Sequence, residues 1–199
     1  MPSAMSTRDR VGTHIIASLS TIQGLADFLP DAIEAAAVRI ADCLLSDGKI
    51  LACGNARSAA QSQLFAALML NGFEQERPGL PAIALSADTP TLAAIDYDHR
   101  LEEIFAKQVR ALGRPGDVLL VYTICGKAPN ILAAVNAAHD REMKVIALTG
   151  RDGGALAPLL TETDVELRVP SESAARTQEA HLLITHCLCD LIDHRLFGH

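Results

Sequence analysis

The sequence predicts an α/β protein, a three-layer αβα sandwich built around a five-stranded parallel sheet. Five short apolar runs, each bounded by turn residues, alternate with longer segments of helical periodicity. The third and fourth runs are almost entirely apolar, which is typical of strands that helices cover on both faces of a parallel sheet. The expected strands are residues 49–54, 81–86, 117–123, 143–150 and 164–169.

The expected helices follow from apolar residues spaced three and four apart. Residues 15–25 and 33–44 have this spacing before the first strand, and residues 101–109 have it between the second and third strands. The last segment, 171–196, is apolar around most of its circumference, so one face can meet the sheet and the rest needs another partner. We therefore expect subunit association through this segment and through residues 15–25.

The length of 199 residues suits one substantial domain rather than two. We divide this domain into N-terminal helices over 1–47, an alternating strand–helix core over 48–170 and a long C-terminal helix over 171–197.

Composition excludes several classes of function. The net charge of -7 disfavours direct nucleic-acid binding, which needs clustered Lys and Arg. The first ten residues lack the apolar core of a signal peptide, and no apolar run is long enough to cross a membrane, so we expect a cytoplasmic protein. The five cysteines are an odd number without CxxC spacing, which indicates reduced and mostly buried thiols.

Two loops can carry chemistry, because ligands of open parallel sheets bind at the carboxyl ends of the strands. The loop CGNARSAAQ at 53–61 offers Ser58 as the cap of a helix whose free N–H groups can bind an anion. The loop TICGKAP at 123–129 offers the hydroxyl of Thr123 and the charge of Lys127. For each loop, an ordinary capped strand-to-helix turn is the alternative.

Ordered blocks along nearly the whole chain resemble one family. The blocks are CGNARSAAQSQLFA, NGFEQERPGLPAIALS, QVRALGRPGDVLLVYT, VIALTGRDGG, DVELRVPS and ARTQEAHLLITHCLCDLID. Together they resemble the phosphoheptose isomerase family of sugar isomerase (SIS) domains, and especially its branch with the DnaA initiator-associating protein. The resemblance implies a flavodoxin-like SIS fold and a homotetramer with its sites at subunit interfaces.

The resemblance also implies where a sugar phosphate binds. In the family, a Gly-Asn-Gly-Gly-Ser loop and a Ser-Thr-Ser-Gly-Asn-Ser loop hold the ligand through hydroxyl and N–H groups. Here Ala56 and Arg57 replace the two glycines of the first loop, and Arg57 either adds a phosphate contact or fills the space that the ligand needs. The expected phosphosugar-binding residues are Asn55, Arg57, Ser58, Thr123, Cys125, Gly126, Lys127 and Gln178.

The family's zinc ligands are a His and a Glu on the helix after the first loop and a Gln and a His on the last helix. The first two positions match Leu64 and Leu68, whereas Gln178 and His186 keep the other two. Leucines cannot coordinate a metal, so we expect no zinc and no other cofactor.

Leu68 also replaces the family's Glu, which leaves the isomerisation without its base. Asp98 and His186 are the best remaining acid and base. The alternative for His186 is a hydrogen-bonded histidine at a subunit interface.

Three functions follow, and the leading expectation leans against an enzyme. It is a non-catalytic tetrameric module that binds a sugar phosphate and a protein partner such as the replication initiator, as the initiator-associating branch implies. The alternative is a phosphoheptose isomerase that converts sedoheptulose 7-phosphate to a heptose 7-phosphate for lipopolysaccharide synthesis. The third is a regulatory sensor of sugar phosphates.

Overall fold

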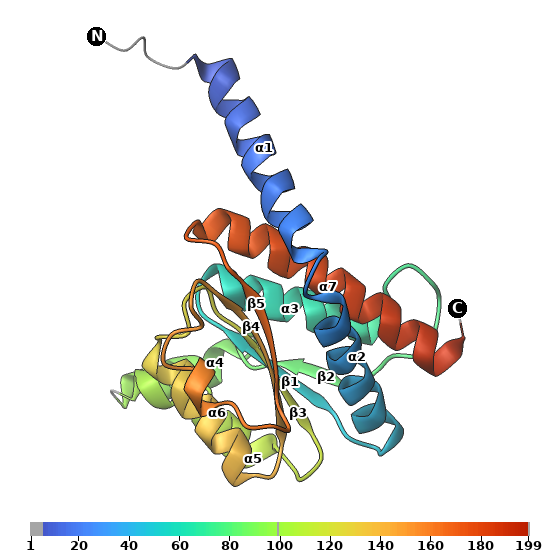
Figure 1. Cartoon of the computed structure of the whole chain (residues 1–199). Coiled ribbons are helices and arrows are strands. Elements are labelled where there is room, and N and C mark those ends of the chain that lie inside the picture. Colours follow the sequence, from blue (N-terminus) through green and yellow to red (C-terminus); the bar gives the residue numbers. More distant parts are fainter. Residues whose placement is uncertain (1–5, 99, 199) are drawn as a thin grey trace.

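The computed structural model describes residues 6–98 and 100–198 of the chain. It contains a five-stranded parallel sheet between two layers of helices, which confirms the predicted fold class (Figure 1). The strands are β1 (Ile50–Gly54), β2 (Ala82–Ala84), β3 (Val118–Tyr122), β4 (Lys144–Gly150) and β5 (Val165–Val169). Each observed strand lies within one of the five predicted apolar runs.

The strand order is β2-β1-β3-β4-β5, the order of flavodoxin-like sheets. Residues Ile50 to Gly54 pair in register with Val118 to Tyr122, so β1 and β3 lie side by side at the centre of the sheet. The chain runs outward from β1 to β2 and then crosses back to β3. This reversal of strand order opens a crevice at the carboxyl ends of β1 and β3, where open α/β sheets bind ligands.

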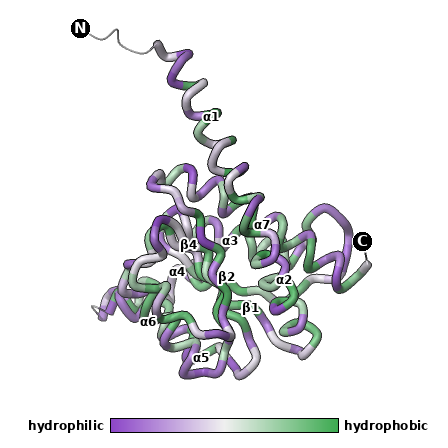
Figure 2. Tube along the Cα trace, in the orientation of Figure 1, coloured by the Kyte–Doolittle hydropathy of each residue, from purple (hydrophilic) through white to green (hydrophobic). Residues whose placement is uncertain are grey.

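One layer contains α2 (Pro30–Leu45), α3 (Arg57–Asn71) and α7 (Ala174–Phe197). The other contains α4 (Thr89–Tyr97), α5 (Ala106–Leu112) and α6 (Pro129–Asp140), together with the short 3₁₀ helices η1 (Leu101–Glu103) and η2 (Ala157–Leu159). Alternate strand residues face the two layers, as a period of two requires. Figure 2 shows the resulting hydrophobic centre along the strands.

Helix α1 (Thr7–Leu25) projects away from this body (Figure 1). Only Leu25 of this helix is buried in the single chain. Two polar contacts hold it to α7, since Arg176 donates to the carbonyl of His14 at 2.5 Å and Ser18 donates to Glu179 at 2.7 Å. Residues 1–5, which belong to the first predicted segment, lie outside the described residues.

One predicted helix is divided. Residues 101–109 form η1 followed by α5, rather than one continuous helix. The chain bends at Ile104 and Phe105, whose side chains enter the core, while the side chain of Leu101 is 57% exposed. The helical spacing of apolar residues continues across this bend, because residues on both sides of it are buried. The spacing therefore did not reveal the break.

All five cysteines are unpaired, and Cys43, Cys53 and Cys189 are buried. Burial raises the pKa of the Cys53 thiol to about 12, which keeps the thiol protonated. Within the described residues, no helix is long and apolar enough to cross a membrane. The cytoplasmic location stays a prediction.

Candidate functional site

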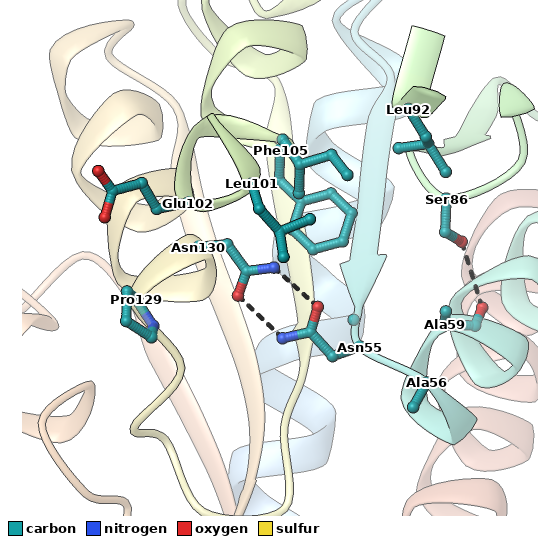
Figure 3. Close-up of a pocket in the computed structure, with 12 residues that line it drawn as sticks. Asn55, Ala56, Ala59, Ser86, Leu92, Leu101, Glu102, Phe105, Pro129 and Asn130 are labelled. Carbon is teal, nitrogen blue, oxygen red and sulfur yellow. Dashed lines mark hydrogen bonds between the residues drawn. The ribbon is translucent and has the colours of Figure 1, made fainter. Parts of the chain in front are cut away.

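A cavity of about 810 Å³ lies where β1, β2 and β3 end (Figure 3). This volume is within the range of small-molecule sites, roughly 300–1,000 Å³. Its position is the crevice that the strand order predicts. The lining residues are Gly54, Asn55, Ala56, Ala59, Ser86, Leu92, Leu101, Glu102, Ile104, Phe105, Pro129 and Asn130.

The loop between β1 and α3 has a strained backbone. Ala56 has φ 51° and ψ -117°, and the N–H of Ser58 donates to the carbonyl of Asn55 at 2.9 Å. These are the features of a type II′ turn, whose first central position is normally glycine. Ala56 therefore keeps a backbone conformation suited to the glycine of the family loop. Such strain persists only where the surrounding structure imposes it, and it gathers at functional sites.

Ser58 does not cap α3. The helix begins at Arg57, two residues earlier than that prediction requires, and it has no side-chain cap. Ser58 is consequently the second residue of the helix and is buried. Arg57 is exposed and is not among the residues that line the cavity, so its side chain leaves the cavity open.

Helices α3 and α6 both begin at the cavity, and neither has a side-chain N-cap. The helix dipole makes each of these ends positive, while the N–H groups of Ser58 and Ala59 in α3 and of Ile131 in α6 already donate to backbone carbonyls. Two such ends that meet at one cavity form a place for an anion such as phosphate.

Asn55 and Asn130 join the two loops by a pair of reciprocal hydrogen bonds (Figure 3). The amide of Asn55 donates to the oxygen of Asn130 at 2.9 Å, and the amide of Asn130 donates to the oxygen of Asn55 at 2.8 Å. Asn130, the second residue of α6, was not among the residues expected from the sequence. Its place directly after Pro129, the last residue of the second small-residue loop, was the only signal that could have found it.

The rest of the cavity wall is largely apolar. Leu92, Leu101, Ile104 and Phe105 come from α4, η1 and the turn into α5. Glu102 is the one carboxylate among the described residues of this wall, and it was also missed from the sequence. Polar amides facing an apolar wall suit a ligand such as a sugar, which carries hydroxyl groups on an apolar carbon frame.

The loop after β3 is held by backbone contacts. Thr123 accepts a hydrogen bond from the N–H of Gly126 at 3.1 Å and is buried. Gly126 has φ 61°, and a Cβ atom there would lie 1.9 Å from the carbonyl oxygen of Gly153. Lys127 is exposed. Neither these residues nor Cys125 line the cavity, so their part in phosphate binding stays a prediction.

Asp98 and His186 lie in different layers of the fold. Asp98 follows α4 and faces Lys107, with 3.8 Å between Oδ2 and Nζ. His186 is on α7, where its ring contacts Phe73 at a centroid distance of 5.4 Å. The sheet separates α4 from α7, so one chain does not bring this acid–base pair together (Figure 1).

Gln178 and Leu64 face a second, shallower hollow between α3 and α7. Gln61 donates to the backbone carbonyl of Gln178 at 2.8 Å. Leu68 instead packs against the hydrophobic core. Of the family's four metal positions, Leu64 and Leu68 therefore offer no donor atom, and Gln178 and His186 are fewer than the three or four protein ligands of a zinc site. In the described part of the chain, no three His, Cys, Asp or Glu residues gather to hold a metal.

Comparison with known proteins identifies the relatives of this chain. The SIS domain model matches residues 14–150. The phosphoheptose isomerase of Methylococcus capsulatus is 59% identical over 98% of this chain and 100% of its own length. The solved phosphoheptose isomerase of Neisseria gonorrhoeae superposes with a TM-score of 0.90 at 47% identity and covers 94% of this chain and 99% of its own. The corresponding structure from Francisella tularensis also has a TM-score of 0.90, at 46% identity over 96% of this chain and 100% of its own.

These relatives correct the leading functional expectation. The prediction of a non-catalytic module for replication initiation is wrong, and so is the prediction that leaned against an enzyme. The relatives that match nearly the full chain are isomerases. The expectation gave too much weight to Leu64 and Leu68. Replacing two side chains on α3 leaves the cavity and both of its loops in place, and these features decide what the fold can bind.

Proposed function

Since the chain belongs to the SIS-domain proteins and, within them, to the phosphoheptose isomerase family, we propose that it is an aldose–ketose isomerase. Its proposed substrate is sedoheptulose 7-phosphate, which it converts to a heptose 7-phosphate. One observation carries the proposal: an open cavity of about 810 Å³ at the strand-order reversal, where two uncapped helices and a strained loop meet.

The parts of this cavity suit the parts of a sugar phosphate. The N-termini of α3 and α6 would hold the phosphate, with Arg57 and Lys127 as cations nearby. Asn55 would hydrogen-bond sugar hydroxyls, and the apolar wall would pack against the carbon frame. Ser58, Thr123, Cys125, Gly126 and Gln178 are retained as proposed binding residues.

The reaction moves one proton between neighbouring carbons. A base removes the proton from the carbon beside the carbonyl, which gives an enediolate, and a proton then returns to the former carbonyl carbon. A second proton passes between the two oxygens, so the step needs neither oxidant nor reductant. Asp98 and His186 remain the acid and base proposed from the sequence, and they require a second subunit to meet. Glu102 is a further candidate base, because it is among the residues that line the cavity; its exposed carboxylate points away from the Asn55–Asn130 pair in Figure 3, so it would have to turn toward the ligand.

We propose that zinc takes no part in this site, and the mechanism uses none. Two leucines stand at the family's ligand positions, where they offer a metal no donor atom.

We also propose the family's homotetramer for this chain. The exposed apolar residues of α1 support it, since they leave an apolar helix face uncovered in one chain. They are Val11, Ile15, Ile16 and Leu19. Light scattering should give four times the chain mass, and Ile15→Glu should lower that mass.

The test of function is turnover of sedoheptulose 7-phosphate in D₂O, followed by NMR, with and without added zinc. Turnover with deuterium at the exchanging carbon is expected. Glu102→Gln should lower kcat by about 10²- to 10⁴-fold if Glu102 is the base. Glu103→Gln is the matched control, since Glu103 pairs with Arg110 at 2.5 Å and does not line the cavity.

A normal rate in Glu102→Gln would return the role to Asp98 and His186, which Asp98→Asn and His186→Asn would then test. Absence of both turnover and deuterium exchange in the unaltered chain would overturn the proposed function.

A further inference from the structure

The Asn55–Asn130 pair leaves part of each amide free for a ligand. An asparagine side chain has two N–H donors and an oxygen that can accept two hydrogen bonds. Each residue uses one donor and one acceptor position in the reciprocal pair. Each therefore keeps one N–H and one oxygen lone pair. Both residues line the cavity, which makes the pair a source of two donors and two acceptors in fixed positions.

This combination suits hydroxyl groups better than phosphate. A hydroxyl both donates and accepts, so it can use an N–H and an oxygen of the pair together, whereas a phosphate dianion accepts only and would meet the amide oxygens unfavourably. The pair carries no charge, while the two helix ends supply the positive potential for an anion. The cavity thus has separate groups for the two parts of a sugar phosphate.

Asn130 also decides how the Asn55 amide is oriented. Asn55 is exposed on the loop after β1, and within residues 6–98 and 100–198 its side chain hydrogen-bonds to Asn130 alone. Asn130 sits in the first turn of α6, a 12-residue helix, and so provides a firm point of attachment. Without it, the Asn55 amide could rotate freely and would lose rotamer entropy when a ligand bound.

We propose that Asn130 is a substrate-positioning and specificity residue that, paired with Asn55, recognises sugar hydroxyls and not the phosphate. The proposal rests on the proposed function for its substrate class, but binding can test it without turnover.

The test compares two ligands by NMR titration, sedoheptulose 7-phosphate and inorganic phosphate. Asn130→Ala should raise the Kd for the sugar phosphate about five- to tenfold, the effect of losing one or two neutral hydrogen bonds. The Kd for inorganic phosphate should stay within about twofold. Asn136→Ala, an exposed change on the same helix, is the matched control and should alter neither Kd. Asn130→Gln keeps both amide functions and should recover part of the sugar-phosphate affinity.

The outcomes separate this inference from the proposed function. An equal loss for both ligands in Asn130→Ala would indicate a structural role and overturn the inference, as would unchanged sugar-phosphate binding. Selective loss of sugar-phosphate binding in a chain that shows no turnover would support the inference and reject the isomerase. No binding of sugar phosphate by the unaltered chain would overturn both.

Discussion

Replacing Ala56 by glycine should stabilise the protein, although most alanine-to-glycine changes destabilise one. Ala56 has φ 51° and ψ -117°, a conformation that glycine adopts without the steric cost of a Cβ atom. Holding a non-glycine residue there costs about 1–3 kcal/mol. Glycine makes the unfolded chain more flexible, which offsets about 0.4–1 kcal/mol of the gain. The expected net effect is about 1 kcal/mol of added stability.

Thermal unfolding measures this effect. For a chain of this size, 1 kcal/mol changes Tm by about 2–4 °C, so Ala56→Gly should raise Tm by that amount. Ala67→Gly is the matched control, because Ala67 is exposed in the interior of α3, the helix that follows Ala56. Glycine there should cost about 1 kcal/mol and lower Tm.

The two variants are therefore expected to change Tm in opposite directions. If Ala56→Gly lowered Tm as much as Ala67→Gly, the reasoning would be refuted, because Ala56 would not be under backbone strain in solution.

Three further predictions concern stability. Asp193→Ala should lower the free energy of unfolding in urea by about 3–5 kcal/mol, because the buried Arg77 loses the carboxylate that lies 2.6 Å from its Nε. If the double variant Arg77→Met/Asp193→Leu restores that stability, the loss is due to the unpaired charge. Burial lowers the pKa of His181 to about 4 in the folded chain. As pH falls, the imidazole therefore takes up its proton in the unfolded chain before it does so in the folded chain, and about 3 kcal/mol of stability should be lost between about pH 6.5 and pH 4. His181→Gln should flatten that slope, and an unchanged slope would contradict the assignment. Dialysis against a chelator, or added zinc, should leave Tm unchanged, whereas a zinc-dependent rise in Tm would show that the chain binds zinc.

Part of the candidate site could be predicted because it lies in loops whose place follows from the strands. Asn55 was found in this way, since it directly follows β1 and the carboxyl ends of parallel strands share one edge of the sheet. Asn130 and Glu102 were missed, because Asn130 meets Asn55 across 75 residues of chain and Glu102 reaches the cavity only through the packing of the layers. Ser58 was misread as a cap because a shift of two residues in a helix start is below what residue type can resolve.

The acid–base pair shows the same limit on a larger scale. Asp98 and His186 were paired by residue type and by resemblance, yet they belong to layers on opposite faces of the sheet. Their local sequence does not indicate which face of the sheet their helices cover.

By itself the sequence determined the fold class, the five strands and the family, because these depend on apolar periodicity and on ordered blocks of residues. Tertiary structure alone decided which side chains meet at the cavity, that Ala56 keeps a glycine-like backbone, and that Asn55 and Asn130 pair. The physical reason is that periodicity reports whether a residue is buried, whereas a binding site depends on distances between segments that only the packed layers bring together.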